Sequence, residues 1–422
     1  MDYQESLDYM LDQLPMYQRV GKAAFKKDLT NTLALCEALG NPQNSFPSIH
    51  IAGTNGKGSS AHLLQYILKS AGYKTGMYTS PHLKSFTERI RVNGIDVEKS
   101  FVADFITEQR DLMEDINPSF FEITVAMAFA YFAFKEVDIA IIEVGLGGRL
   151  DSTNVINPEI SLITNISLDH TDMLGNSLEL IATEKAGIIK EEVPVVIGHS
   201  TIETKHVFES KAARLNSPIV FADQVSEVQQ KADQANLVID GMNYVLPEEI
   251  ADYQVKNIPG VVLVLERIRS KFPKLDSINI SDSINNFFLE GGIQGRWQII
   301  GIDPVIICDT AHNIAGVEAV MKQIESMVFT KLWCIWGMVN DKDISMILDI
   351  MPRKAEYIFC QASIPRALEA NELLIAAGRS GLHGQVIADV NSALDFVKDK
   401  AGKNDLIFVG GSTFVVAEIN DL

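Results

Sequence analysis

The chain has 422 residues, of which 47% are hydrophobic, so it can bury sizeable cores in two or three domains of about 150 residues each. Its formal net charge of −19, without any long run of Lys and Arg, opposes binding to nucleic-acid backbones and anionic membranes. Residues 1–14 lack the pattern of a secretory signal, and the longest apolar stretch, 123–134, is too short to cross a bilayer. We expect a cytoplasmic protein whose partners are small molecules.

The first 48 residues are expected to be mainly helical and to end in a link rich in Pro and Asn, NPQNSFPS. The four cysteines of the chain are far apart and lack the spacing of metal ligands. They are therefore expected to be reduced residues of the cores: Cys36, Cys308, Cys334 and Cys360.

Residues 49–72, IHIAGTNGKGSSAHLLQYILKSAG, combine a buried strand, a glycine-rich turn and an amphipathic helix. Gly53, Gly56 and Gly58 allow backbone N–H groups to turn inward around phosphate oxygens at the positive end of the helix. Lys57 supplies a cation for the terminal phosphates, and Ser59 supplies a hydroxyl ligand for a magnesium ion. The common P-loop pattern has four residues between its glycines, whereas this loop has two. A tight turn without a ligand is the alternative, but the flanking strand and helix favour a site for a nucleoside triphosphate.

Further apolar strands alternate with helical segments along the chain, which predicts an α/β protein with a doubly wound sheet. From about residue 201 to 256 the pattern is irregular, with a small hairpin at 235–246, and helical patterning returns at 258–272. The alternation restarts after residue 297. We therefore expect a P-loop-type domain at residues 1–293 and a smaller Rossmann-like α/β domain at 294–422. The strands are expected in these ranges: 73–83, 138–148, 159–170, 193–198, 304–313, 331–339, 355–362, 384–389 and 405–412.

Polar residues stand directly after several of these strands. Glu143 ends an apolar strand, where P-loop enzymes commonly keep an acidic magnesium-site residue, although capping a turn is the alternative. His170 and Ser80 also follow strands. The alternative for His170 is a loop histidine whose hydrogen bonds are satisfied locally. The alternative for Ser80 is a residue that only forms a turn before proline.

Six motifs occur in the order and approximate spacing of one family: GTNGKGS, TSPHL, EVGLGGRLDSTN, LDHTDMLG, EKAGIIK and DTAHN. The chain resembles the bifunctional dihydrofolate synthase/folylpolyglutamate synthases of the Mur ligase superfamily. The resemblance runs from residues 21–43 to the terminal GGSTFVVAEI. It also accounts for the shortened P-loop. Thr310 stands where glycine is usual and Ile314 where proline is usual, and these departures concern the shape of that loop rather than its presence.

The resemblance implies roles for individual residues. Lys57, His170, Lys185 and Arg296 match catalytic positions, and Lys185 matches the lysine that is carbamylated in many of these ligases. The alternative for Lys185 is a solvated lysine paired with Glu184. Asp151 matches a pteridine-binding position, and the alternative there is an aspartate that only stabilises a turn. ATP-binding positions are Gly53, Thr54, Asn55, Gly56, Lys57, Gly58, Ser59, Asn257, Arg296, Asp309 and His312. Substrate-binding positions are Ser80, Pro81, His82 and Asp151. Positions for two Mg²⁺ ions are Ser59, Ser80 and Glu143, with His170 at the second ion.

The reaction implied by the resemblance is an ATP-dependent ligation by a monomeric enzyme. The γ-phosphoryl group of ATP would activate a carboxylate of dihydropteroate or of a reduced folate as an acyl phosphate. The amino group of L-glutamate would then attack it, and ADP and phosphate would leave. A ligase for a cell-wall precursor and a P-loop ATPase that acts as a conformational switch are the alternatives.

Overall fold

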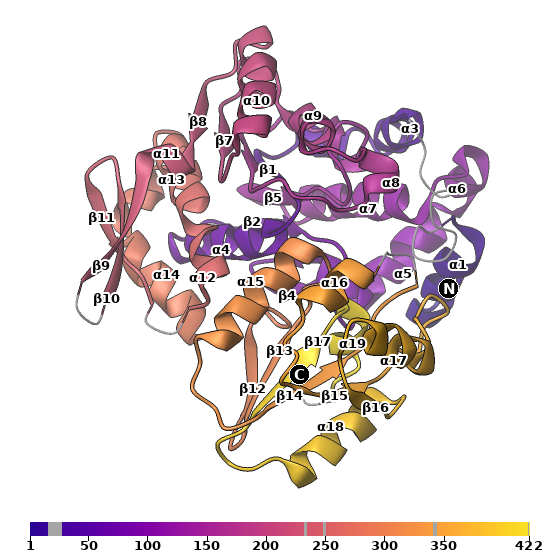
Figure 1. Cartoon of the computed structure of the whole chain (residues 1–422). Coiled ribbons are helices and arrows are strands. Elements are labelled where there is room, and N and C mark those ends of the chain that lie inside the picture. The colour runs from indigo at the N-terminus through magenta and orange to yellow at the C-terminus, as the bar shows by residue number, and fades with distance from the viewer. Residues whose placement is uncertain (16–27, 232–233, 248–249, 341–343, 421) are drawn as a thin grey trace. The chain divides into compact units, whose positions relative to one another are not determined.

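A computed structural model describes residues 1–15, 28–231, 234–247, 250–340, 344–420 and 422 of the chain (Figure 1). It contains two compact units, and each is described separately below. Unit 1 comprises Met1–Ile250 and Gln254–Phe288, and unit 2 comprises Ala251–Tyr253 and Leu289–Leu422. The expected domain boundary at 293/294 stays a prediction. Residues 21–27 of the N-terminal stretch that carries the resemblance lie outside the described residues.

Unit 1 is built on an eight-stranded sheet in the order β4-β3-β2-β5-β1-β6-β7-β8. Its six strands from β2 to β8 in this order run parallel, whereas β3 and β4 form an antiparallel edge that the sequence did not predict. The strands are β1 (Ser48–Ala52), β2 (Thr75–Tyr78), β3 (Ile90–Val92), β4 (Ile95–Asp96), β5 (Ile139–Glu143), β6 (Ile160–Ile163), β7 (Val195–Ile197) and β8 (Ile219–Phe221).

Thirteen α-helices of the described chain begin before residue 289. They are α1 (Tyr3–Gln13), α3 (Thr30–Ala38), α4 (Lys57–Ser70), α5 (Lys99–Glu108), α6 (Arg110–Ile116), α7 (Phe120–Phe134), α8 (Thr171–Leu174), α9 (Leu178–Lys185), α10 (Ile202–Arg214), α11 (Ala222–Val225), α12 (Asp252–Val255), α13 (Ile258–Ile268) and α14 (Ile280–Leu289). Helix α4 packs on β2 and β5, and α13 packs on β6 and β7.

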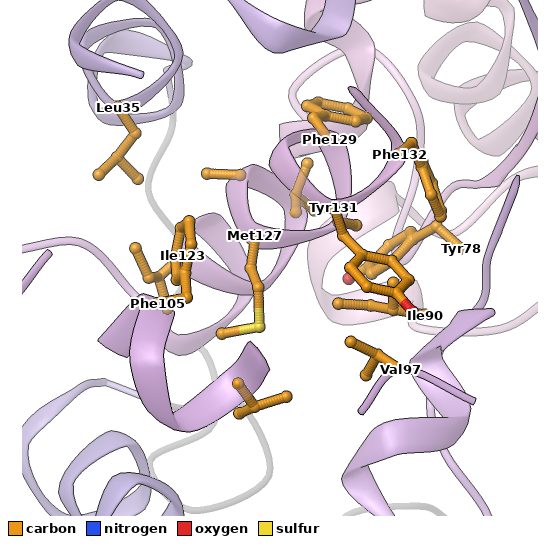
Figure 2. Packing of buried hydrophobic residues seen from close by; sticks show 14 of the residues in the cluster. Leu35, Tyr78, Ile90, Val97, Phe105, Ile123, Met127, Phe129, Tyr131 and Phe132 are labelled. Atoms are coloured by element: carbon orange, nitrogen blue, oxygen red, sulfur yellow. The ribbon is translucent and has the colours of Figure 1, made fainter. Parts of the chain in front are cut away.

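Helix α7 contains the longest apolar stretch of the sequence and is buried along most of its length. It begins with a capping box, in which the Ser119 amide donates to Glu122 at 2.6 Å and the Glu122 amide donates to Ser119 Oγ at 3.2 Å. Figure 2 shows Ile123, Met127 and Phe132 of this helix within one apolar cluster that also takes in side chains from α3, α5 and the sheet. Because α7 is buried among apolar neighbours along most of its length, its pattern is apolar on nearly all sides.

The strand order places a topological switch point beside β1. Strand β1 pairs with β5 on one side and with β6 on the other, and all three are parallel. Their carboxyl ends therefore meet at one edge of the sheet, where open α/β sheets bind their ligands.

The region from residue 201 to 256 is more regular than its sequence suggests. Helix α10 and strand β8 extend the main sheet by one further crossover unit, so the expectation of an irregular segment was wrong for residues 202–221. The expected hairpin is confirmed within a separate three-stranded antiparallel sheet of β9 (Ser226–Lys231), β10 (Gln234–Ile239) and β11 (Met242–Val245).

Unit 2 has a six-stranded sheet in the order β12-β13-β17-β14-β15-β16, parallel except for the antiparallel edge strand β12. All five expected strands are confirmed, and β12 was missed. The strands are β12 (Gln298–Ile302), β13 (Val305–Asp309), β14 (Leu332–Trp336), β15 (Glu356–Phe359), β16 (Gly384–Val386) and β17 (Leu406–Gly410). The helices are α15 (Ile314–Glu325), α16 (Ser345–Ile350), α17 (Ala370–Arg379), α18 (Val390–Lys400) and α19 (Thr413–Ala417).

The core of unit 2 contains large aromatic side chains from its central strands. Trp336, Tyr357, Phe359 and Phe408 are each at most 1% exposed, and the rings of Tyr357 and Phe359 stack with centroids 5.6 Å apart. All four cysteines are buried and free, as expected. Among the described residues, no helix is long and apolar enough to cross a membrane.

Candidate active site

The glycine-rich turn between β1 and α4 has a backbone shape that only glycine can adopt at two positions. Gly53 has φ +148°, and a Cβ built there would lie 1.8 Å from the Oγ1 atom of Thr164. Gly56 has φ +82°, and its Cβ would lie 2.2 Å from the Oδ1 atom of Asn257. The turn is therefore closely packed and left-handed at Gly56. The side chain of Asn257, which lies just before α13, reaches the turn.

A polar segment after β6 holds the turn in place. The Thr164 hydroxyl donates to the Asn55 carbonyl at 2.6 Å, and the Asn165 amide group donates to the same oxygen at 2.8 Å. The Asn55 amide donates to Asn165 Oδ1 at 3.1 Å, and the Ser167 amide donates to Thr54 Oγ1 at 3.0 Å. Sequence reasoning missed these three residues, although their position directly after an apolar strand was a usable signal.

Glu143 lies at the carboxyl end of β5, and its carboxylate faces the first turn of α4. A Cβ built on Gly58 would lie 3.5 Å from Glu143 Oε2, and the Ser80 amide donates to the same oxygen at 3.2 Å. Glu143 is 5% exposed. The structure thus brings Glu143, Ser80 and the start of α4, which includes Ser59, to one edge of the sheet. A buried carboxylate at this edge of the sheet supplies an oxygen ligand of the kind that Mg²⁺ prefers.

Two lysines point toward carbonyl groups of the glycine-rich turn. Lys57 Nζ donates to the Thr54 carbonyl at 3.2 Å, and Lys185 Nζ donates to the Gly53 carbonyl at 2.9 Å. Lys185 is 4% exposed, and its burial, together with the positive charge of Lys57, lowers its pKa to about 7.

The alternative of a solvated Lys185 paired with Glu184 is wrong. Glu184 instead binds Arg149 at 2.9 Å. Two carboxylates, those of Asp169 and Asp151, lie close enough to Lys185 to oppose the lowering of its pKa. Asp169 therefore belongs to the surroundings of the site, and sequence reasoning missed it.

His170 directly precedes helix α8 and has a left-handed backbone, with φ +48°. Its amide donates to Asp169 Oδ1 at 2.9 Å, and its ring Nε2 lies 3.9 Å from the same oxygen. Among the residues that the structure describes, no three His, Cys, Asp or Glu side chains come together in a metal-binding cluster. A metal ion here would therefore need oxygen ligands from serine, water or phosphate as well.

Ser80, Pro81 and His82 are predicted substrate-binding residues, and contacts within unit 1 fix the position of His82. Arg89 Nε donates to His82 Nδ1 at 2.8 Å, and burial together with the Arg89 charge lowers the His82 pKa to about 3. The peptide bond between Ser80 and Pro81 is cis. His82 is therefore neutral at physiological pH, and its ring hydrogen lies on Nε2.

Asp151 is buried, and its carboxylate organises the loop after β5. It accepts hydrogen bonds from the Leu146 amide at 2.8 Å and from the Thr153 amide at 3.0 Å. Burial raises the Asp151 pKa, and these hydrogen bonds oppose that rise. The turn-aspartate role that we weighed as an alternative is thus present. Direct contact of Asp151 with a pteridine stays a prediction.

Unit 2 gathers its three predicted site residues on two neighbouring loops. Asp309 ends β13, and its carboxylate accepts from the Trp297 amide at 2.8 Å and from the Ala311 amide at 2.7 Å. The Trp297 contact fixes the loop that carries Arg296. His312 follows Ala311, and its Nδ1 lies 3.0 Å from the Thr310 carbonyl. The loops that carry Arg296 and His312 are therefore both hydrogen-bonded to Asp309 within this unit.

Comparisons with known proteins agree with this geometry. Residues 51–260 match the family "Mur ligase middle domain", and residues 295–413 match "Mur ligase, glutamate ligase domain". The chain is 31% identical over 94% of its length to the dihydrofolate synthase/folylpolyglutamate synthase of Bacillus subtilis, of which it covers 95%. It spans about half the length of two haloarchaeal relatives, from Haloferax volcanii and Halobacterium salinarum, described as probable bifunctional folylpolyglutamate synthase/dihydropteroate synthases.

Solved structures show the same fold. Escherichia coli FolC in complex with DHPP and ADP superposes with a TM-score of 0.86 at 27% identity, covering 99% of this chain and 96% of that one. A bifunctional folylpolyglutamate synthase/dihydrofolate synthase with Mn, AMPPNP and L-glutamate bound gives 0.83 at 26% identity, with 99% and 97% covered. From its motifs, its fold and these relatives, the chain belongs to the dihydrofolate synthase/folylpolyglutamate synthase family, a group of ATP-dependent ligases with the Mur ligase fold.

Proposed function

We propose that the chain ligates L-glutamate to a folate acceptor, dihydropteroate or a reduced folate, at the expense of ATP. The observation that carries this proposal is the meeting of the glycine-rich turn, Lys57, Lys185 and Glu143 beside β1. A carboxylate is a poor acylating agent, so transfer of the γ-phosphoryl group would give an acyl phosphate. The amine of L-glutamate would then attack, phosphate would leave, and ADP would be released.

The residues of the chain divide this work between binding and charge stabilisation. The amides of the glycine-rich turn would cradle the phosphates, and Lys57 would leave the Thr54 carbonyl to bind the terminal phosphates. Arg296 would offset charge on the transferring phosphoryl group. Asn257 would contact the adenine, and His312 and Asp309 would complete the nucleotide site.

Divalent metal binding is part of the proposal. Glu143, Ser80 and Ser59 would hold one Mg²⁺ ion, and His170 would belong to a second site. The buried Glu143 carboxylate beside α4 supports the first site. When bound, Mg²⁺ polarises phosphoryl oxygens and neutralises their charge.

Lys185 is proposed to work as a carbamate. Its burial and lowered pKa support this, because a neutral amine can add to carbon dioxide and an ammonium cannot. The resulting carboxylate analogue would reverse the charge at this position and help to hold a metal ion or its waters. We expect Lys185→Ala to be nearly inactive and short-chain carboxylates to restore part of its activity. Full activity of Lys185→Ala would reject the role.

The test of the function is ADP release by the purified protein with ATP, Mg²⁺ and L-glutamate. Dihydropteroate and tetrahydrofolate are supplied separately as acceptors, and product mass shows whether glutamate is added. Turnover only with a muramyl acceptor would favour the cell-wall alternative. ATP hydrolysis that needs neither acceptor nor glutamate would favour the other alternative, a P-loop ATPase that acts as a conformational switch. A monomeric state and a cytoplasmic location also stay predictions.

A further inference from the structure

The phenol of Tyr253 completes the hydrogen bonding of the Asp309 carboxylate. Tyr253 Oη donates to Asp309 Oδ2 at 2.6 Å, and the Trp297 amide donates to the same oxygen. The Ala311 amide donates to Asp309 Oδ1. Asp309 is 1% exposed, so its carboxylate depends on these donors in place of water.

Each of these donors comes from a different segment of unit 2. Trp297 directly follows Arg296, Ala311 directly precedes His312, and Tyr253 stands in α12. Among the three donors, Tyr253 is the one side chain. The Thr310 amide also donates to the Gly295 carbonyl at 2.9 Å, which ties the first two segments together.

The segment 251–253 is bound to unit 2 although the chain on both of its sides belongs to unit 1. Besides the Tyr253 contact, the Asp252 amide donates to Gln323 Oε1 of α15 at 3.0 Å. Two hydrogen bonds thus hold Tyr253 in place: one is donated by its own hydroxyl group, and the other by the backbone amide of its neighbour Asp252. A phenol held in this way donates at a fixed place, at little cost in side-chain entropy.

We propose that Tyr253 is a positioning residue for the ligase reaction. Its hydroxyl group holds the Asp309 carboxylate, which in turn fixes the loops carrying Arg296 and His312. This inference rests on the proposed function, because the two loops matter for turnover only if they act on the nucleotide.

The physical reason is the cost of a buried acceptor that loses a donor. With phenylalanine at position 253, Asp309 Oδ2 keeps only the Trp297 amide from this set, in surroundings that exclude water. The carboxylate would then rotate or admit water, and the Trp297 and Ala311 amides would lose their fixed acceptor. Arg296 and His312 would consequently sample more orientations.

The test compares Tyr253→Phe with a matched control, Tyr357→Phe. Tyr357 is also buried in unit 2, and its hydroxyl donates one hydrogen bond, to the Pro352 carbonyl at 2.7 Å. We expect Tyr253→Phe to lower kcat/KM for ATP about tenfold, as the loss of a hydrogen bond to a charged group would. Tyr357→Phe should stay within about twofold of wild type, since its bond touches neither loop.

Two further readouts separate positioning from a general loss of structure. Hydrogen exchange should quicken at the Trp297 and Ala311 amides in Tyr253→Phe and not in Tyr357→Phe. In an Asp309→Asn background, adding Tyr253→Phe should lower activity little further, because the phenol acts through the carboxylate. Equal kinetics and equal exchange in the two phenylalanine variants, with an active wild-type enzyme, would overturn the inference. An inactive wild-type enzyme would instead refute the proposed function, and the exchange result would still test the contact.

Discussion

Lys57 is the residue whose role can be isolated most cleanly. Its ammonium group donates to the Thr54 carbonyl, a loop group, at 3.2 Å, so Lys57→Ala should leave the fold intact. If it acts on phosphate, its loss should lower turnover roughly 100- to 1000-fold, equivalent to about 2.7–4 kcal/mol. ADP release and thermal unfolding measure the two properties. Lys69→Ala, an exposed lysine of the same helix, is the control, and near-normal turnover of a folded Lys57→Ala protein would contradict the role.

Lys185 should make stability depend on pH in a defined window. Its pKa is about 7 in the folded protein and about 10.4 when unfolded. Between these values the unfolded chain binds a proton that the folded chain does not, so stability rises with pH by at most about 1.4 kcal/mol per unit. The stability of Lys185→Met relative to wild type should therefore be highest near pH 7 and fall toward pH 10. Urea unfolding in carbon dioxide-depleted buffer measures this. Lys69→Met is the control, and the same pH-independent difference for both would contradict the prediction.

At the scale of elements, the glycine-rich turn can be tested with two glycines of nearly equal φ. Gly56 and Gly72 have φ of +82° and +86°, but a Cβ at Gly56 would meet Asn257 Oδ1 at 2.2 Å, whereas Gly72 has open space. Alanine at either position should cost about 1–2 kcal/mol of stability. Only Gly56→Ala should also weaken AMPPNP binding, by tenfold or more, because Asn257 must move. Titration calorimetry with Mg²⁺ would show this, and equal affinities in both variants would refute it.

The sequence predicted the parallel strands other than β8 well, because each of them is a short apolar run followed by polar or glycine residues. It failed for β3, β4 and β12, the antiparallel strands at the margins of the two sheets, which are short or mix polar with apolar residues. Of these, β4 and β12 are the edge strands with a neighbour on one side only, whereas β3 lies between β4 and β2. Helix α10 and strand β8 were also missed, since α10 is largely polar and β8 has only three residues.

The candidate site was predictable where a motif placed a residue after a strand, as for Glu143 and Lys57. It was not predictable where a contact joins segments that are far apart in the sequence and that only the tertiary fold brings together. Thr164 and Asn165 lie 109 and 110 positions from their partner Asn55, and Tyr253 lies 56 positions from Asp309. Spacing in one sequence carries no information about such pairs, because the strand order that joins them is a tertiary property.

At the scale of the whole molecule, the two units should respond differently to nucleotide. The glycine-rich turn, Lys57, Glu143 and Asn257 all belong to unit 1, which has its own core. A chain with two cores is not expected to unfold in a single two-state step. A ligand that binds only the folded state adds about 2.7 kcal/mol of stability at 100 times its Kd.

We therefore expect AMPPNP with Mg²⁺ to raise the calorimetric transition of unit 1 by several degrees. The transition of unit 2 should move less, because the turn that binds the phosphates is not part of it. Lys57→Ala should abolish most of the shift, since its cation contributes to phosphate binding, while Lys69→Ala should retain it. Hydrogen exchange of peptides from 49–72 and from 331–339 assigns each transition to its unit. A larger shift in unit 2, or an undiminished shift in Lys57→Ala, would contradict the placement of the phosphate site in the glycine-rich turn.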